Sequence, residues 1–557
     1  MKLSGAQILI ECLKREGVEL LIGYPGGQVL PIFDKLYDCD IRFILPRHEQ
    51  AAAHAADGYA RATGKVGVCL ATSGPGATNL TTGIANAYMD SIPMVAITGQ
   101  VKSHLIGNDA FQEADVTGIT RPITKHNYLV KDVRELARII REAFYIASTG
   151  RPGPVLIDIP SDIQLQETEF IWPESVELRS YKPTYFGHPG QIKKAVKLIS
   201  GAKKPLLYIG GGVISSGAAP EIKILAEKIQ APVTWTLMGI GGFPATHKLG
   251  LGMLGMHGTA YANHAIMSAD VIIAIGARFD DRVTGRIDAF APGAKVIHID
   301  IDPASISKNV KVDIPIVGDV KNIVGEMLEQ MKKTPNTAEW LKDIEALKKK
   351  YPLKYGKDGD KIKPQYVVEQ IYQATKGEAI ITTEVGQNQM WAAQWYQYNH
   401  PRSFISSGGL GTMGFGFPAA MGAKLGCPDK VVFDIAGDGS IQMNIQELAT
   451  CVCNKINVKV AILNNGYLGM VRQWQELFYK KRYSHTCITG PDFVKLAESY
   501  GAVGIRATKR EEVRPAIEKA LSTDNTVFID FRVEPEENVF PMVPAGEAIN
   551  RMIEGLA

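Results

Sequence analysis

Paired cysteines, long apolar segments and an excess of charge are all missing from this sequence. The 557 residues include 7 cysteines and no CxxC pair, which disfavours zinc sites and disulfides and favours free thiols in a reducing cytoplasm. No apolar run approaches the roughly 18 residues that cross a bilayer, and Glu11 interrupts the apolar N-terminal stretch, so that an amphipathic helix is predicted there rather than a signal peptide. A net charge of +3 gives no electrostatic basis for binding nucleic acid or an anionic membrane. We expect a cytoplasmic protein with neither kind of partner.

Short apolar runs that end in glycine-rich turns are abundant, and helical periodicity follows them. The pattern recurs at 65–88, 204–214, 269–279 and 430–440. Repeated strand–turn–helix units predict an α/β protein with doubly wound parallel sheets, in which ligands bind beyond the carboxyl ends of the strands. At roughly 150 residues per domain, the length predicts three or four domains.

Two segments without hydrophobic periodicity predict where the domains end. Residues 165–190 gain Pro, Glu and Tyr, and residues 333–365 are rich in charge and open with an expected surface helix. Whether the C-terminal tail, which has too little apolar content for a domain, is a lid or a frayed end stays open. The predicted division is 1–165, 190–330, 365–540 and a tail at 541–557.

The strongest local signal is GDGS at 437–440, followed by LNN at 463–465. A buried strand precedes each motif and a crossover helix fits between them, so a βαβ unit would bring Asp438 and Asn465 to the same edge of a parallel sheet. Their oxygens suit Mg²⁺, and glycines before a helix N-terminus suit a diphosphate. GDG alone is more often an ordinary turn, but the second motif favours a metal and diphosphate site.

GDGS and LNN together resemble the cofactor signature of the thiamine-diphosphate enzymes, and VGQNQMW at 385–391 resembles that family's other diphosphate segment. The resemblance implies three doubly wound domains, which bind the pyrimidine, a central FAD and the diphosphate with its metal. It implies that Asp438, Asn465 and the carbonyl of Tyr467 bind Mg²⁺. The family more often has His where Asn388 stands. The positions that the resemblance assigns to thiamine diphosphate are Glu49, Asn79, Gly386, Gln387, Asn388, Gly411, Met413, Gly437, Gly439, Ser440 and Met470.

Glu49 stands just inside a predicted helix start, in the sequence RHEQ. From its position alone, it would merely complement the helix dipole. The resemblance instead implies that Glu49 bonds the aminopyrimidine ring and promotes removal of the thiazolium C2 proton. In relatives this acid faces the cofactor of a second subunit, so the resemblance implies a homodimer at minimum and leaves a tetramer open. GYPGG at 23–27 resembles the loop over the thiazolium and places Gly27 near the reacting centre.

The middle segment resembles the flavin-containing acetolactate synthases through GARFDDRVTG at 276–285 and LGMHG at 254–258. An alternative interpretation is a doubly wound domain with an empty ligand site, because three glycines after a strand are a weak dinucleotide signal. The positions that the resemblance assigns to FAD are Arg151, Gly210, Gly211, Gly212, Met256, His257, Gly276, Ala277, Arg278, Asp300, Ile301, Gly318 and Asp319.

The resemblance to the acetolactate synthases implies that two 2-keto acids are joined after one of them loses carbon dioxide. It assigns Arg282 to the carboxylate of the second keto acid and Trp474 to its side chain, with Phe111 and Gln112 nearby. Without it, Arg282 would be a surface ion pair and Trp474 ordinary core. A small regulatory subunit is also implied. The alternatives are another thiamine-diphosphate decarboxylase or oxidase, and a partner protein without catalysis.

Overall fold

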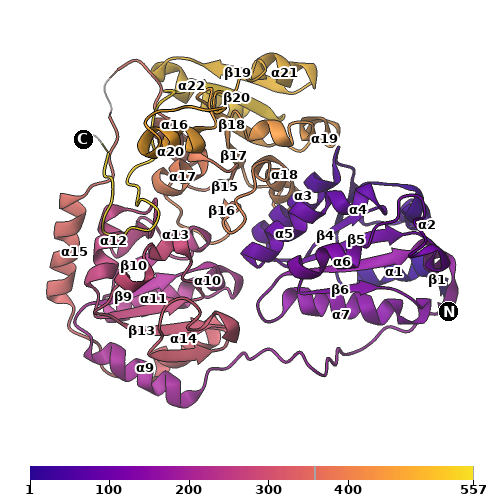
Figure 1. Ribbon diagram of the computed structural model, residues 1–557, viewed down its shortest axis with the longest axis horizontal. Coiled ribbons are helices and arrows are strands. Elements are labelled where there is room, and N and C mark those ends of the chain that lie inside the picture. The colour runs from indigo at the N-terminus through magenta and orange to yellow at the C-terminus, as the bar shows by residue number, and fades with distance from the viewer. Residues whose placement is uncertain (357–358, 556–557) are drawn as a thin grey trace.

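Three six-stranded parallel sheets, each flanked by helices, follow one another along the chain in the computed structural model of the protein (Figure 1). The structure describes residues 1–356 and 359–555. The predicted linker 333–365 and the predicted tail 541–557 each include two residues outside these ranges, 357–358 and 556–557. The expected fold class, three doubly wound α/β domains, is confirmed.

The first sheet belongs to the N-terminal domain, and every pair of neighbouring strands in it is parallel. Helix α3 (Glu49–Thr63) follows the edge strand β3 directly, so Glu49 lies at the carboxyl edge of this sheet. In spatial order the strands are β3 (Arg42–Ile44), β2 (Leu20–Gly23), β4 (Gly67–Ala71), β5 (Met94–Gln100), β7 (Pro154–Pro160) and β6 (His126–Leu129).

The second sheet forms the middle domain. Strands β10 and β11 are added on one side of β9, and β12, β13 and β14 are added on its other side. The strand order therefore reverses between the neighbours β9 and β12. Open parallel sheets bind ligands at such a reversal. In spatial order the strands are β11 (Gly250–Met253), β10 (Val233–Trp235), β9 (Pro205–Ile209), β12 (Val271–Ile275), β13 (Lys295–Asp300) and β14 (Ile314–Val317).

The third sheet forms the C-terminal domain and reverses its order between β15 and β17. Its register pairs Gly437, at the end of β17, with Leu463 on β18, which sets Asp438 beside the residues that follow β18. The predicted βαβ juxtaposition is therefore confirmed. In spatial order the strands are β16 (Phe404–Ile405), β15 (Ile380–Thr383), β17 (Val432–Gly437), β18 (Lys459–Asn464), β20 (Val527–Arg532) and β19 (Val503–Ala507).

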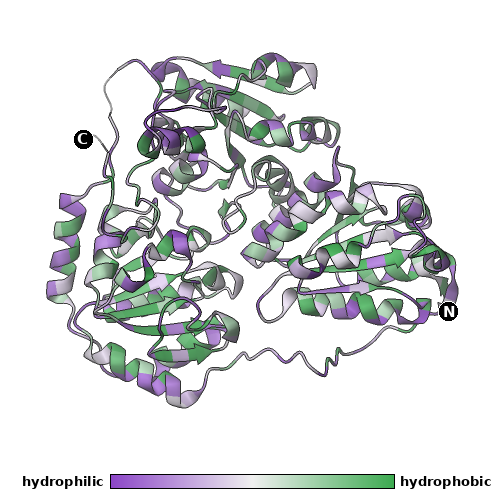
Figure 2. Ribbon diagram, viewed as in Figure 1, coloured by the Kyte–Doolittle hydropathy of each residue, from purple (hydrophilic) through white to green (hydrophobic). Residues whose placement is uncertain are grey.

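The central strands are buried on both faces, which explains why they are continuous apolar runs instead of alternating ones. All five residues of β12 are buried, and so are the six of β18. Figure 2 shows the hydrophobic residues concentrated in the sheets and on the helix faces turned toward them. Burial of these runs supplies most of the stabilising free energy of each domain.

The N-terminal and C-terminal domains meet where α3 packs against α18 (Gly416–Gly426). A Cβ on Gly58 would lie 2.2 Å from the carbonyl oxygen of Ala419, and a Cβ on Gly422 would lie 1.8 Å from that of Ala55. Only glycine allows the two helix backbones to approach this closely. The contact fixes the helix that begins at Glu49 against the domain that carries Asp438.

The segments between and after the domains are more structured than their composition predicts. Residues Glu167–Glu169 form β8, which pairs antiparallel with β1 (Lys2–Ser4), so the first part of the expected linker 165–190 returns to the N-terminal domain. The expected surface helix is α15 (Ala338–Lys350), and its Trp340 is buried and donates to the carbonyl of Pro205. Such long-range pairing leaves no local pattern in the sequence.

The described part of the tail is docked and not frayed. It crosses the middle domain, where the backbone N–H of Val543 donates to the carbonyl of Met256 and that of Arg286 to the carbonyl of Glu547. Val543 and Ile549 are buried. The yellow trace in Figure 1 accordingly runs from the C-terminal domain down to the middle domain.

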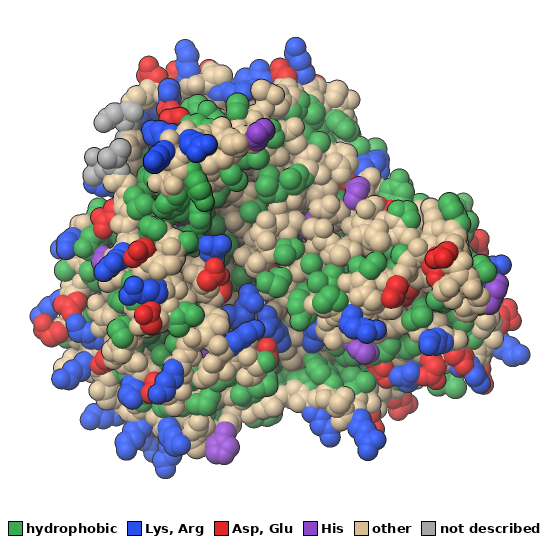
Figure 3. Space-filling view, viewed as in Figure 1, with side chains coloured by type: hydrophobic (Ala, Val, Ile, Leu, Met, Phe, Trp, Pro, Cys, Tyr) green, Lys and Arg blue, Asp and Glu red, His purple; other side chains and the backbone are tan. Residues whose placement is uncertain are grey.

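The surface carries charges of both signs. On the face shown in Figure 3, blue and red side chains are interspersed over all three domains, in keeping with a net charge of +3. Among the described residues, no helix combines the length and apolar character needed to cross a membrane.

Candidate functional site

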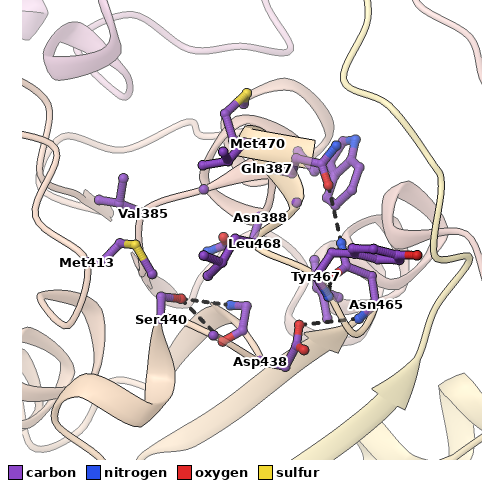
Figure 4. A pocket seen from close by; sticks show the side chains of 17 residues that line it. Val385, Gln387, Asn388, Met413, Asp438, Ser440, Asn465, Tyr467, Leu468 and Met470 are labelled. Carbon is purple, nitrogen blue, oxygen red and sulfur yellow. Dashed lines mark hydrogen bonds between the residues drawn. The ribbon is translucent and has the colours of Figure 1, made fainter. Parts of the chain in front are cut away.

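A pocket opens at the carboxyl ends of β15, β17 and β18, where the strand order reverses (Figure 4). In Figure 4, Asp438 and Ser440 lie at one end of the pocket and Met470 lies at the other. The predicted residues that line it are Gly386, Gln387, Asn388, Met413, Gly437, Asp438, Gly439, Ser440, Asn465, Tyr467 and Met470. Residues assigned from separate motifs between positions 386 and 470 therefore converge, while their individual roles stay predictions.

Asp438 is the buried acid of this pocket, with 1% of its surface exposed. Its carboxylate accepts the backbone N–H groups of Asn465 (3.3 Å) and Gly466 (3.2 Å). Burial raises the pKa of Asp438 to about 6, against the effect of these hydrogen bonds. Among the described residues no cationic side chain pairs with Asp438, and a buried carboxylate of this kind fits a site for a cation.

The other oxygen donors near Asp438 are uncharged. The Asn465 side chain accepts from the N–H of Tyr467 at 3.0 Å and donates to Gln387 at 3.3 Å, while the backbone N–H of Asn465 donates to Asp438. Among the described residues, no three His, Cys, Asp or Glu side chains gather to hold a metal ion. One acid, one amide and a carbonyl suit a hard cation that keeps water and phosphate ligands, such as Mg²⁺.

Glycines open the pocket to a ligand. A Cβ on Gly437 would meet only side-chain atoms of Asn388 and Ser440, both at 3.4 Å, so the space before its backbone is free of protein backbone. Gly386 has a φ of +152°, which L-residues with a side chain rarely adopt, and it precedes the first turn of α17 (Gln387–Trp395). These two positions fit the close approach of a diphosphate to the chain.

The side-chain amide of Asn388 already donates to two backbone carbonyl groups of the protein. Its Nδ2 donates to the carbonyl oxygens of Glu384 at 2.9 Å and of Ile435 at 2.7 Å. The side chain therefore ties β15 to β17 beneath the pocket and presents its Oδ1 toward Gly437. A direct hydrogen bond from its amide to a phosphate stays a prediction.

The residues predicted from the N-terminal motifs form a second cluster at the carboxyl edge of the first sheet. The Asn79 amide donates to the Glu49 carboxylate at 3.0 Å, and a Cβ on Gly76 would lie 3.4 Å from that carboxylate. The backbone of Gln112 lies against Gly74, and Gly27 begins a short 3₁₀ turn with open space around it. Several loops thus present these groups on one edge.

The two clusters do not meet within one chain. Every residue that lines the pocket lies between Val385 and Val471, and neither Glu49 nor Gly27 is among them. Gly411 is also outside the lining, in an exposed loop. Large apolar side chains around the N-terminal cluster are exposed, with Leu30 at 59% and Phe111 at 84%.

The glycines of the middle domain face each other at the strand reversal. A Cβ on Gly210 would lie 2.3 Å from the carbonyl oxygen of Gly276, and one on Gly212 would lie 2.6 Å from the Cα of Gly276. Close packing of two loops accounts for these glycines without a ligand. Gly211 is different, because its Cβ would meet only Met238, at 3.3 Å.

Polar groups suited to a ribose or a nucleotide surround this reversal. Asp300 ends β13, and burial raises its pKa to about 6. Arg151 reaches across from the N-terminal domain and pairs with Asp302 at 3.1 Å. His257 is buried, and its Nδ1 has no hydrogen-bond partner among the described residues. Of the other predicted positions, Asp319 caps α14 (Val320–Gln330), and Arg278 lies in the loop after β12.

Arg282 lies outside the diphosphate pocket. Its side chain is 62% exposed and is 3.8 Å from the Asp281 carboxylate, the ion pair considered as the alternative in the sequence. It lines a second pocket together with Met256 and tail residues 543–546. Trp474 is half-buried on α20 (Gly469–Phe478), one turn after the pocket residue Met470, and packs edge-on against Phe478.

Several pocket residues escaped prediction from the sequence. Those that line it without having been assigned are Val385, Trp391, Leu463, Leu468, Gly469 and Val471. Val385 and Trp391 flank the predicted segment 386–388, Leu463 lies on β18 before Asn465, and the others lie in the loop after Asn465 and the first turn of α20 (Gly469–Phe478). Their apolar character resembles ordinary core, so that only the three-dimensional arrangement identifies them.

Comparison with known proteins places each domain in one family. Residues 3–119 match the thiamine pyrophosphate enzyme N-terminal TPP binding domain, residues 192–329 the central domain and residues 384–531 the C-terminal TPP binding domain. The C-terminal match contains the whole pocket lining.

Whole-length relatives narrow the family further. The chain is 52% identical over 560 residues to the acetolactate synthase large subunit of Buchnera aphidicola subsp. Schizaphis graminum and 52% identical over 562 residues to that of Haemophilus influenzae. It is 50% identical over 563 residues to the acetolactate synthase isozyme 3 large subunit of Escherichia coli. Each alignment covers 99% of this chain and 98% of the relative. The chain therefore belongs to the thiamine pyrophosphate enzyme family and, within it, to the acetolactate synthase large subunits.

Proposed function

We propose that this chain is the catalytic subunit of an acetolactate synthase. It decarboxylates pyruvate and transfers the two-carbon unit to a second pyruvate, giving 2-acetolactate, or to 2-ketobutyrate, giving 2-aceto-2-hydroxybutyrate. This is the first common step in valine, leucine and isoleucine biosynthesis. The observation that carries the proposal is the pocket at the third sheet's strand reversal, in which Asp438 is buried, pairs with no cationic side chain of the described residues, and lies beside Asn465 and glycine backbone.

Thiamine diphosphate, when bound, supplies the electron sink that lets carbon dioxide leave a 2-keto acid. The chain's own residues bind and orient it. Asp438, Asn465 and the carbonyl of Tyr467 would hold Mg²⁺, and the open backbone at Gly437 and Gly386 would receive the diphosphate. Because a cation would offset the burial of Asp438, the residues present fit the metal.

Exclusion of water distinguishes joining from simple decarboxylation. Apolar side chains line part of the same pocket, among them Met413, Leu468, Met470 and Val471. A dry wall slows protonation of the reacting carbon and leaves time for the second keto acid to arrive. Arg282, with its exposed guanidinium, would bind that acid's carboxylate, and Trp474 would contact its side chain.

The proton-transfer role of Glu49 requires two subunits. The pocket lining within one chain lacks Glu49, whereas exposed Leu30 and Phe111 beside the Glu49 cluster fit a contact with another protein surface. A homodimer in which each chain presents Glu49 to its partner's pocket satisfies both observations. Whether dimers pair into tetramers is a question for mass measurement in solution.

FAD would bind at the strand reversal of the middle domain. Asp300, at the end of β13, is suited to a ribose hydroxyl, and Arg151 and the loop at Gly211 border the same region. The support is the buried carboxylate of Asp300, which can accept from a hydroxyl, and the buried Nδ1 of His257, which has no hydrogen-bond partner among the described residues.

A small regulatory subunit is the expected protein partner. The relatives from Buchnera, Haemophilus and Escherichia are each named a large subunit, which supports a smaller companion. Adding such a companion should change the activity and its inhibition by a branched-chain amino acid. No change on addition would count against this part of the proposal. The cytoplasmic location stays a prediction.

The test of the function is product analysis with pure protein, pyruvate, thiamine diphosphate, Mg²⁺ and FAD. We expect acetolactate, detected as acetoin after acid treatment, and a mixed product when 2-ketobutyrate is added. Acetaldehyde as the main product would indicate a decarboxylase, and acetyl phosphate with peroxide would indicate an oxidase. Absence of carbon dioxide release would instead support the non-catalytic alternative.

A further inference from the structure

The turn before Glu49 is held by a carboxylate from the far end of the chain. Both oxygens of Glu447 accept the backbone N–H of Arg47, at 3.0 and 3.1 Å, across a sequence separation of 400 residues. Glu447 is fully buried and is the first residue of α19 (Glu447–Cys453). The hydroxyl of Thr450 donates to the same carboxylate at 2.7 Å and fixes its orientation.

This contact fixes the backbone at Arg47, one residue before the N-cap of α3. His48 is the N-cap and its ring accepts from the N–H of Gln50, so that the helix begins at Glu49. Asn79 orients the Glu49 side chain, whereas Glu447 holds the backbone two residues before it. The first contact therefore orients the carboxylate of Glu49, and the second fixes the backbone that leads to it.

The segment that ends at Glu447 begins at Asp438. Along it, Gln442 donates to the carbonyl of Asp438 at 2.8 Å, and Asn444 donates to the carbonyl of Gly414, next to the pocket residue Met413, at 2.6 Å. The segment therefore borders the pocket of its own chain at one end and the Glu49 turn at the other. In the proposed dimer, that Glu49 serves the partner's pocket.

We propose that Glu447 is a positioning residue for Glu49, which fixes the acid against the partner's cofactor from the loop that borders its own chain's metal site. The proposal rests on the proposed function, because it assumes that Glu49 acts on thiamine diphosphate. The competing explanation is that Glu447 only stabilises the contact between the N-terminal and C-terminal domains. The two differ in whether the loss of Glu447 affects the chemistry of Glu49 or only the stability of the fold.

The first variant is Glu447→Gln, which keeps the size of the side chain but replaces one acceptor oxygen by a donor. The matched control is Glu142→Gln, because Glu142 is also a buried carboxylate but lies on α7 (Leu136–Ser148), where it accepts from Tyr128 and Arg138. Thr450→Val is a milder second variant that removes only the hydroxyl orienting Glu447.

The readout is hydrogen–deuterium exchange at C2 of thiamine diphosphate bound with Mg²⁺ to the full-length protein, followed by quenched-flow NMR, because this exchange reports Glu49 before any substrate binds. We expect Glu447→Gln to slow the exchange about tenfold or more, because small misplacements of a catalytic group cost large factors in rate. Thr450→Val should slow it less, and Glu142→Gln should exchange as the wild type does. Affinity for thiamine diphosphate and the melting temperature should stay unchanged in Glu447→Gln.

A double variant separates the competing explanations. If Glu447 acts through Glu49, adding Glu447→Gln to Glu49→Gln will slow the exchange no further than Glu49→Gln alone. Wild-type exchange in Glu447→Gln overturns the positioning role, and so does a slower exchange that appears only together with lost cofactor affinity or a lower melting temperature. A wild-type protein that neither binds the cofactor nor exchanges its C2 proton refutes the proposed function itself, and the positioning role with it.

Discussion

Two glycine-rich turns of this molecule look alike in sequence and differ in what their glycines face. At Gly437 an added Cβ would meet only two side chains at ordinary contact distance, whereas at Gly212 it would lie 2.6 Å from the Cα of Gly276. The first glycine leaves space in front of the backbone, and the second is already filled by protein. A glycine motif therefore indicates close approach, but only the fold tells whether a ligand or another loop approaches.

The largest effect is expected from a substitution in the pocket that contains Gly437, where a ligand is proposed to bind. Asp438→Asn removes the charge that would balance a divalent ion and should lower acetolactate formation by about 100-fold or more at moderate Mg²⁺. Steady-state rates across a Mg²⁺ titration measure it. Asp313→Asn is a suitable control, because Asp313 likewise accepts a backbone N–H, from Val296, but lies in the middle domain. Equal rates in the two variants would remove the metal role from Asp438.

Gly437→Ala tests whether the space in front of the Gly437 backbone receives the diphosphate. The methyl group fits the protein but occupies the space assigned to the diphosphate, so we expect the dissociation constant of thiamine diphosphate to rise about tenfold, equivalent to 1.4 kcal/mol. Calorimetric titration measures this change, and the melting temperature should stay that of the wild type. Gly201→Ala, at the open end of α9 (Pro189–Gly201), is the control. Unchanged affinity would show that the space before Gly437 is not used.

Gly212→Ala tests whether the close packing of two loops explains the glycines of the middle domain. Its Cβ would collide with the backbone of Gly276, and overpacking of this kind costs about 1–3 kcal/mol of folding free energy. Urea denaturation followed by circular dichroism measures the loss. Gly211→Ala should cost much less, because its nearest contact, Met238 Cβ at 3.3 Å, has to give by only a few tenths of an ångström. If Gly212→Ala proved as stable as Gly211→Ala, the packing explanation of these glycines would be wrong.

The smallest expected effect concerns the acceptor. Trp474→Leu removes an indole one turn from Met470 and should lower the preference for 2-ketobutyrate over pyruvate by about fourfold, equivalent to the roughly 0.8 kcal/mol of one buried CH₂ group. Competition between the two acceptors, with both products quantified, gives the ratio. Phe478→Leu changes the aromatic neighbour instead and should leave the ratio nearer to that of the wild type. An unmoved ratio in Trp474→Leu would exclude that residue from the acceptor pocket.

What the sequence predicts well is local. The strands before GDGS and LNN are continuous apolar runs, and a single crossover of fixed handedness brings their ends together, so that the placement of Asp438 beside Asn465 follows from pattern alone. The amphipathic N-terminal helix, α1 (Gly5–Arg15), and the surface helix α15 follow from periodicity in the same way.

What the sequence does not predict depends on contacts between distant segments. The hydrogen bonds of Glu447 to Arg47 join two domains, and the docking of the tail on Met256 joins the chain's end to its middle. The exposure of Arg282 depends on how the tail packs beside it. No periodicity or motif encodes such pairs, because each partner alone has the character of an ordinary surface or helix-end residue.

The most direct test of the central claim is a crystal structure of the protein with thiamine diphosphate and Mg²⁺ bound. We expect one metal ion about 2.1 Å from an Asp438 oxygen and from Asn465 Oδ1, with diphosphate oxygens completing its coordination shell. We also expect Glu49 of a second subunit to lie beside the pyrimidine ring. A cofactor bound elsewhere, or both side chains turned away from the ion, would contradict it.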